Sequence, residues 1–239
     1  MGTMCGRFAV TTDPALLAEK IKALDEVTGS APSGVPTPNY SANYNVAPTT
    51  TVSTVVKRHT DPDDESTRRV RSMRWGLVPV WAKTTADGGP DTKGPLLINA
   101  RSDKGTTAPA FRSSVKSKRC LVPMDGWYEW RPNGELASGK KAPKTPFYMY
   151  AGDGEPLFMA GLWSTWRPKD APKDTAPLLS CTIITTDAAA HLSDIHDRMP
   201  LTISERDWDR WLDPDAPVDE GLLRGHGDLD RIEIREVSR

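Results

Sequence analysis

The first residue that could do covalent chemistry is Cys5, which follows Met4 and precedes Gly6. In a chain that starts at Met4 and loses that methionine, Cys5 presents an α-amine and a thiol on one carbon framework. An α-amine has a pKa of about 7.7–8.0, against about 10.4 for lysine, so far more of it is neutral near pH 7. Such an amine attacks aldehydes to give an imine, on which the thiol can close a thiazolidine; the thiol alone can attack a carbonyl. The alternative is a buried, unreactive cysteine.

A carboxylate stands among bulky aromatic residues in the segment Asp125-Gly126-Trp127-Tyr128-Glu129-Trp130. Burial there would raise the pKa of Glu129 toward the range of a general acid–base catalyst. The alternative is an alternating strand that places Glu129 on the solvent face, with Tyr128 and Trp130 together on the other face. The residues alone leave both interpretations open.

Two further segments carry polar side chains that suit a substrate site. Asn99 and Arg101 follow an apolar run over residues 95–98, where Asn99 could hold a substrate oxygen and Arg101 could pair with a phosphate. His196 stands between Ile195 and Asp197 and could act as a proton shuttle. Each segment also has a structural interpretation, a turn for the first and a packed histidine for the second.

Composition excludes several classes of protein. The 239 residues carry a net charge of -1, so the chain is not a globally basic nucleic-acid coat protein. Its 3 cysteines lack CxxC spacing, which argues against a disulfide framework and a zinc knuckle. No apolar run approaches the roughly 18 residues of a membrane span, and the N-terminus lacks the pattern of a signal peptide. We expect a cytoplasmic protein without metal, cofactor or membrane contact.

The charge is nevertheless segregated along the chain. Residues 101–131 contain seven basic and three acidic side chains, whereas residues 205–239 contain eleven acidic and six basic ones. A basic face near tryptophans could hold a phosphate backbone and stack bases. On the charge distribution alone, we favour the alternative that these charges are solvated and the tryptophans lie in the core.

The elements that must position these residues are mainly strands. The spacing of Leu17, Ile21 and Leu24 after Asp13 and Pro14 predicts a helix over residues 13–27. Strands are predicted over residues 51–57, 119–124, 127–130, 147–150, 156–163 and 178–185, and short helices over 187–195 and 204–212. Loops are predicted over 28–43, 83–95 and 131–146, with a charged hairpin tip or disordered insert over 58–72. The absence of a helical crossover pattern favours one α+β domain with a mixed, largely antiparallel sheet.

Seven motifs together resemble the SRAP family (SOS response-associated peptidase), which processes abasic sites. They occur in the family's order, from Cys5 to at least Pro200, and read Met4-Cys5-Gly6-Arg7-Phe8, Tyr44-Asn45-Val46-Ala47-Pro48, Trp75-Gly76-Leu77-Val78-Pro79, Ile98-Asn99-Ala100-Arg101, Cys120-Leu121-Val122-Pro123, Gly126-Trp127-Tyr128-Glu129-Trp130 and Ile195-His196-Asp197-Arg198-Met199-Pro200. The resemblance implies a single SRAP-type α+β domain over residues 5–239, with a mixed, largely antiparallel curved sheet flanked by short helices. It also implies that residues 1–4 are an extension removed before Cys5.

The resemblance further implies the activity. A monomer in the cytoplasm, associated with the nucleoid when acting, would bind single-stranded DNA that contains an abasic site. Cys5 would attack the ring-opened aldehyde and form a Schiff base, then a stable thiazolidine crosslink that protects the strand.

By the matching motif positions, Cys5 would be the nucleophile through both amine and thiol, and Asn99 would position the deoxyribose or that amine. Glu129 would be the general acid–base, His196 would protonate the sugar oxygen, and Thr185 would orient the site. DNA contacts would come from Arg7, Asn45, Pro48, Trp75, Arg101, Trp127 and Arg198, with the three arginines on phosphates.

One departure from the family pattern concerns the start, Met1-Gly2-Thr3-Met4. Ordinary methionine removal would stop at Gly2 and leave the Cys5 nitrogen in a peptide bond. A cloning remnant, a true start at Met4, or self-cleavage before Cys5 would each resolve this. Two other functions remain open: a thiol or N-terminal-nucleophile peptidase acting on peptides, and a non-catalytic module for single-stranded DNA. A lyase activity is compatible with the crosslinking function that the resemblance implies.

Overall fold

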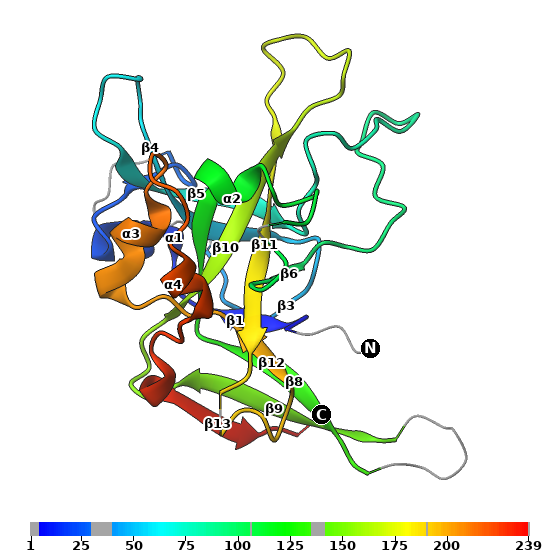
Figure 1. The fold of residues 1–239 in the computed structure, drawn as a ribbon, viewed down its shortest axis with the longest axis vertical. Helices are drawn as coiled ribbons and strands as arrows, with labels where there is room; N and C mark the ends of the chain where they lie inside the picture. The colour runs from blue at the N-terminus through cyan, green and yellow to red at the C-terminus, as the bar shows by residue number, and fades with distance from the viewer. Residues whose placement is uncertain (1–4, 30–39, 106, 135–141, 190, 239) are drawn as a thin grey trace.

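The computed structural model describes residues 5–29, 40–105, 107–134, 142–189 and 191–238. Its strands form two sheets, of which the smaller lies across the lower part of the molecule in Figure 1. In spatial order this sheet contains β13 (Ile232–Glu236), β9 (Lys144–Ala151), β8 (Gly126–Pro132), β1 (Phe8–Val10) and β3 (Asn43–Val46). All of its neighbouring strands pair antiparallel.

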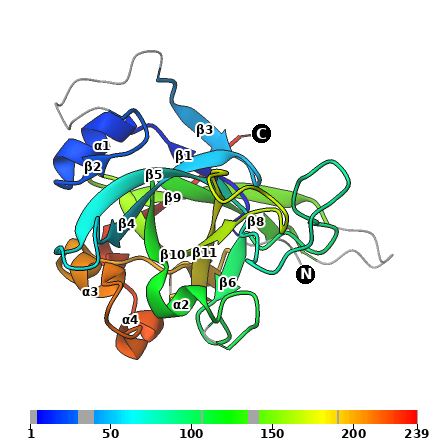
Figure 2. The same cartoon turned by 90° about the horizontal axis from the view of Figure 1, so that it is seen from above.

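The larger sheet curves back on itself. Its order is β12 (Arg198–Pro200), β11 (Leu178–Asp187), β10 (Leu157–Trp166), β7 (Arg119–Met124), β4 (Thr51–Arg58), β5 (Thr67–Trp75) and β2 (Leu24–Asp25), with β6 (Asn99–Arg101) on β11. A parallel pairing of β5 with β11 joins the two sides, so β11, β10, β7, β4 and β5 form a closed ring of strands. Figure 2 shows these strands curving around a common interior. The predicted α+β class with a mixed, largely antiparallel sheet is confirmed, although there are two sheets and not one.

The helices are short and lie outside the sheets. They are α1 (Pro14–Lys20), α2 (Ser114–Ser117), the 3-10 turn η1 (Glu205–Asp207), α3 (Trp208–Leu212), α4 (Glu220–Arg224) and a second 3-10 turn, η2 (Leu229–Arg231). Asp13 caps α1 by accepting from the backbone N–H groups of Ala15 and Leu16, as its position in the sequence indicates. None of the helices formed by the described residues has the length and apolarity that a bilayer crossing needs.

Two groups of buried side chains make up the core. One lies under the helices and includes Leu17, Leu121 and Trp211. The other includes Cys5, Trp75 and Trp127, and it joins the small sheet to the large one. All six residues of β7 are buried, because this strand is central in the ring, between β10 and β4, and its two faces contact the two groups of the core. Cys5 is therefore held at the junction of the two sheets.

The six predicted strands are all present, and most are longer than expected. The helix predicted over residues 13–27 is wrong beyond Lys20. Lys22 has a φ of 52°, which ends the helix, and Leu24–Asp25 then pairs with β5. The helix over 204–212 is present as η1 and α3. The helix predicted over 187–195 is wrong for the residues described: Asp187 ends β11, residues 188–189 are irregular, and residues 191–195 form turns.

The prediction of a hairpin tip or disordered insert over residues 58–72 is wrong for the residues that belong to strands. Only the residues between β4 and β5 form a hairpin tip, because β5 begins at Thr67. The arginines of β5 are accommodated in the strand because they form ion pairs with carboxylates. Arg68 pairs with Asp209 at 2.7 Å, and Arg69 with Glu26 at 2.5 Å. The predicted loops over 28–43 and 131–146 fall partly outside the described residues.

Candidate active site and nucleic-acid interface

The pairing of β1 with β8 brings Cys5 to Glu129. Phe8 faces Trp127 across this antiparallel pair, and the Tyr128 N–H donates to the Arg7 carbonyl at 2.9 Å. The chain continues past Arg7 toward Cys5, whose backbone nitrogen donates to Glu129 Oε1 at 2.7 Å. Cys5 has a φ of 39°, a left-handed conformation that is unfavourable for a non-glycine residue and is held here by its surroundings.

Glu129 is buried, with 2% of its surface exposed. Burial raises the pKa of Glu129 to about 7, while the Cys5 N–H and the charge of Lys144 oppose the rise and Asp197 adds to it. Such a group is partly protonated near neutral pH and can both give and take a proton. The alternative that placed Glu129 on the solvent face is wrong, because Trp127 and Glu129 occupy the buried face of β8 while Tyr128 and Trp130 are half-buried.

The thiol of Cys5 is also fully buried. Burial, and then the nearby Glu129, raise the pKa of this thiol well above its usual value. Because the thiolate is the nucleophilic form, the resting thiol is unreactive until a base accepts its proton. The geometry thus places the Cys5 nitrogen and its protonated thiol beside the Glu129 carboxyl group.

Two arginines flank the end of β11. Thr185 of β11 pairs with Arg101 of β6 on one side and with Pro200 of β12 on the other. Arg198 donates to the Thr185 carbonyl at 2.6 Å and approaches Asp187 at 2.5 Å. Thr185 is fully buried, so it acts on this region chiefly by holding Arg198 through its carbonyl.

His196 is half-buried two residues before Arg198. Its Nδ1 lies 3.1 Å from the Arg198 backbone nitrogen, a contact that suits an unprotonated Nδ1, and close to the Asp197 carboxylate, a contact that suits a protonated one. Burial lowers the pKa of His196, although Asp197, whose Oδ1 lies 2.8 Å from Nδ1, opposes this shift. The lowered pKa favours the neutral ring and makes the protonated ring a stronger acid than an ordinary imidazolium.

The structure brings the predicted catalytic residues into two neighbouring groups. Cys5 and Glu129 are hydrogen-bonded, and Thr185, His196 and Arg198 are connected through β11 and β12. Lys144 and Asp197 shift the pKa values of both Glu129 and His196, so the groups share one electrostatic environment. Asn99 begins β6 opposite Ile183, two positions before Arg101.

The residues predicted to contact DNA are placed differently from one another. Arg7 donates to Asn45 Oδ1 at 2.8 Å on an exposed edge, and Pro48 is half-buried. Trp75 and Trp127 are fully buried, and the Trp75 indole N–H donates to the Ile98 carbonyl at 3.0 Å. As placed here, neither indole presents a face on which a base could stack.

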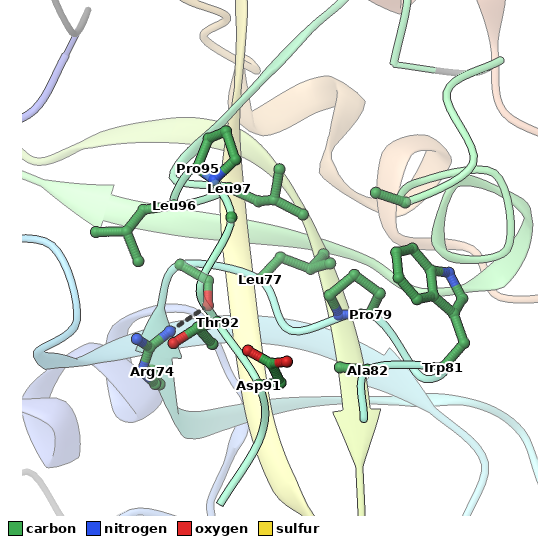
Figure 3. Close-up of a pocket in the computed structure, with 13 residues that line it drawn as sticks. Arg74, Leu77, Pro79, Trp81, Ala82, Asp91, Thr92, Pro95, Leu96 and Leu97 are labelled. Atoms are coloured by element: carbon green, nitrogen blue, oxygen red, sulfur yellow. Dashed lines mark hydrogen bonds between the residues drawn. The ribbon is translucent and has the colours of Figure 1, made fainter. Parts of the chain in front are cut away.

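Trp81, one of the tryptophans near the basic segment, is 66% exposed, whereas the motif positions assign the DNA contacts to Trp75 and Trp127. Trp81 borders a hollow of about 280 Å³ whose other apolar lining includes Leu77, Pro79, Leu96 and Leu97. Figure 3 shows these side chains, with Trp81 at one end, Arg74 and Leu96 toward the other, and Asp91 between them. The hollow adjoins the segment that leads into Asn99, because the Leu77 N–H donates to the Leu97 carbonyl. The sequence placed Trp81 among the tryptophans near the basic segment, but which of them is exposed depends on packing.

Among the residues that the structure describes, the His, Cys, Asp and Glu side chains form no group of three or more suited to holding a metal ion. The groups at the Cys5 junction are the Cys5 nitrogen, its thiol and the Glu129 carboxyl group, and the His196 ring shares their electrostatic environment through Lys144 and Asp197.

Comparison with known proteins gives consistent results over nearly the whole chain. Abasic site processing protein YoqW of Bacillus subtilis (strain 168) is 33% identical over 241 residues, covering 98% of this chain and 92% of that protein. Abasic site processing protein YedK of Escherichia coli (strain K12) is 33% identical over 217 residues, covering 87% and 79%. Abasic site processing protein HMCES of Gallus gallus is 30% identical over 243 residues, covering 92% and 68%.

Solved structures have the same fold. A protein of Bacteroides thetaiotaomicron superposes with a TM-score of 0.74 at 23% identity, covering 98% of this chain and 92% of that one. A phage-related protein of Bordetella bronchiseptica gives a TM-score of 0.67 at 26% identity, covering 98% and 95%. The model of the family described as SOS response associated peptidase (SRAP) matches residues 4–239. Because the family model matches nearly the whole chain and these relatives are 30–33% identical to it over more than two thirds of their length, the chain belongs to the SRAP family.

Proposed function

We propose that this protein processes abasic sites in single-stranded DNA by forming a thiazolidine crosslink through Cys5. The observation that carries the proposal is the 2.7 Å contact between the Cys5 nitrogen and Glu129 in a buried setting. The names of the relatives, all abasic site processing proteins, supply the substrate class.

The chemistry needs only the groups at this junction. The free amine of Cys5 adds to the aldehyde carbon of the ring-opened site, and the resulting carbinolamine loses water to give an imine. Glu129 in its acid form donates the proton that lets the hydroxyl leave. The Cys5 sulfur then bonds to the imine carbon, and the thiol proton passes to the imine nitrogen through Glu129. Water is the only by-product.

The neighbouring residues would prepare the sugar. An abasic deoxyribose exposes its aldehyde only after the ring opens, which requires a proton on the ring oxygen. His196 is suited to donate it from its protonated form, because the lowered pKa makes that imidazolium a stronger acid than usual and returns the ring to its neutral form. Asn99 would position the deoxyribose or the Cys5 amine. Arg7, Arg101 and Arg198 would bind phosphates, with Asn45 and Pro48 beside the strand.

A second activity concerns the bond that precedes Cys5. While this bond is intact, the Cys5 nitrogen is an amide and cannot form an imine. Hydrolysis would add hydroxide to the Met4 carbonyl carbon and a proton to the departing nitrogen. Glu129 is positioned to supply that proton, and the description of the family as a peptidase favours such self-cleavage. Cleavage of other peptides is the alternative function that remains to be separated from it.

The test is intact-mass spectrometry of the protein mixed with an oligonucleotide that carries one abasic site. A chain that begins at Cys5 should gain one oligonucleotide minus one water, whereas Cys5→Ala should gain none. A tetrahydrofuran abasic analogue, which has no aldehyde, is the matched control. A free Cys5 that forms no adduct would contradict the proposal. Release of more than one peptide fragment per protein molecule, lost in Cys5→Ala, would favour the peptidase. Denaturing electrophoresis of the same reaction separates crosslinking from strand cleavage.

A further inference from the structure

The two arginines at the end of β11 already hold an anion that belongs to the protein. Asp103 accepts two hydrogen bonds from Arg101, at 2.9 Å from Nε and 2.8 Å from Nη2. The same carboxylate lies 3.8 Å from Nη2 of Arg198. Asp103 thus lies between the guanidinium groups that the proposed function assigns to DNA phosphates.

This arrangement is that of an anion in a guanidinium cradle. A two-point contact between arginine and a carboxylate has the same geometry as one between arginine and a phosphate. The hydrogen bond from Arg101 is the main reason that the pKa of Asp103 falls to about 2, so the carboxylate is charged at every physiological pH. One carboxylate and one phosphate cannot occupy the same donors of Arg101 at once.

The partners differ in how easily they can move. The Arg198 side chain is 6% exposed and is held by the Thr185 carbonyl and Asp187, so it stays in place. The Arg101 and Asp103 side chains are 49% and 48% exposed. Asp103 also borders a polar hollow of about 360 Å³, whose charged lining comprises Arg224, Asp187 and Glu220, so the carboxylate has space to rotate away from Arg101.

We propose that Asp103 is an internal competitor for the DNA phosphate, and that its displacement from Arg101 sets the affinity of the protein for single-stranded DNA. This inference rests on the proposed function. Its consequence is selectivity: undamaged single strands, which form no covalent bond, are held weakly, while an abasic strand is captured by the Cys5 chemistry once it arrives. Asp103 is a specificity-determining residue that does not touch the reacting atoms.

The test compares Asp103→Asn with Asp63→Asn by fluorescence anisotropy on an undamaged single-stranded oligonucleotide. Asp63 lies exposed in the tip between β4 and β5, so both variants change the net charge equally. We expect Asp103→Asn to lower Kd by about fivefold, the upper range for release of an exposed ion pair, and Asp63→Asn by less than about twofold.

The opposite sign overturns the inference. If Asp103 instead holds Arg101 in its binding orientation, Asp103→Asn will weaken DNA binding. If Asp103→Asn and Asp63→Asn change Kd equally, the effect is one of net charge alone, and the inference is wrong. The variant Arg101→Gln distinguishes a failure of this inference from a failure of the proposed function. If Arg101→Gln weakens binding while Asp103→Asn does not strengthen it, only the competitor fails. If Arg101→Gln has no effect, the phosphate role of Arg101 and the competitor fail together. In the double variant, the gain from Asp103→Asn should be mostly lost.

Discussion

The Cys5–Glu129 junction and the Arg101–Arg198 cradle lie in one molecule but handle charge in opposite ways. At the junction, burial raises the pKa of Glu129 to about 7, and the Cys5 thiol stays protonated. At the cradle, every charge has an opposite partner, and the pKa of Asp103 falls to about 2. The first region has groups that exchange protons near pH 7, while the second has charges that are permanent.

This difference separates reaction from binding. Proton transfer is efficient when the pKa of the catalyst is near the working pH, which here requires a carboxylate withdrawn from water. Phosphate binding requires cations that never lose their charge, which arginine supplies at the surface. We therefore expect changes at the junction to affect rate and changes at the cradle to affect affinity.

The largest expected effect is that of Glu129→Gln on crosslinking. The amide keeps the shape of the side chain but cannot move a proton, so the single-turnover rate at saturating abasic DNA should fall by about 10²–10⁴-fold. Kd for undamaged single-stranded DNA should change little. The experiment uses a chain that begins at Cys5, with Glu65→Gln in the exposed hairpin tip as control. A loss of less than about tenfold would mean that Glu129 is not the acid–base group.

The next effect is on stability in the chain whose Cys5 nitrogen is still acylated. Because the folded pKa of Glu129 is about 7 and an ordinary Glu titrates near 4.5, the folded protein binds more protons than the unfolded one between these values. The free energy of unfolding should therefore fall as pH rises through this window, by roughly 3 kcal/mol from this group. Urea denaturation at pH 5 and pH 8 measures the fall, and Glu129→Gln should remove it. An unchanged slope in that variant would contradict the assignment.

A smaller effect distinguishes the two arginines of the cradle. Arg198→Gln removes buried hydrogen bonds to Thr185 and should lower the free energy of unfolding by about 2 kcal/mol. Arg101→Gln, whose side chain is half-exposed, should cost about 0.5 kcal/mol or less while still weakening DNA binding. Urea denaturation and anisotropy on both variants make the comparison. Equal losses of stability would show that the cradle is not divided into a fixed and a mobile arginine.

Local sequence was sufficient for the strands and for the Asp13 cap, because alternation of side chains and capping depend on near neighbours. It failed where distant contacts decide. Residues 68–71 read as a charged tip because their carboxylate partners, Glu26 and Asp209, are far away in the chain. The apolar residues over 21–27 continue the helical spacing, yet Leu24 and Asp25 form a strand that pairs with β5.

The sequence by itself determined which residue types are available and in what order: Cys5, Asn99, Glu129 and His196, with arginines near them. Only the tertiary structure decided their surroundings. It buried Glu129 against the Cys5 nitrogen, buried Trp75 and Trp127 while exposing Trp81, and placed Asp103 in the cradle. The physical reason is that a pKa, an exposed ring and a competing ion pair all depend on water being excluded or admitted by residues far apart in the chain.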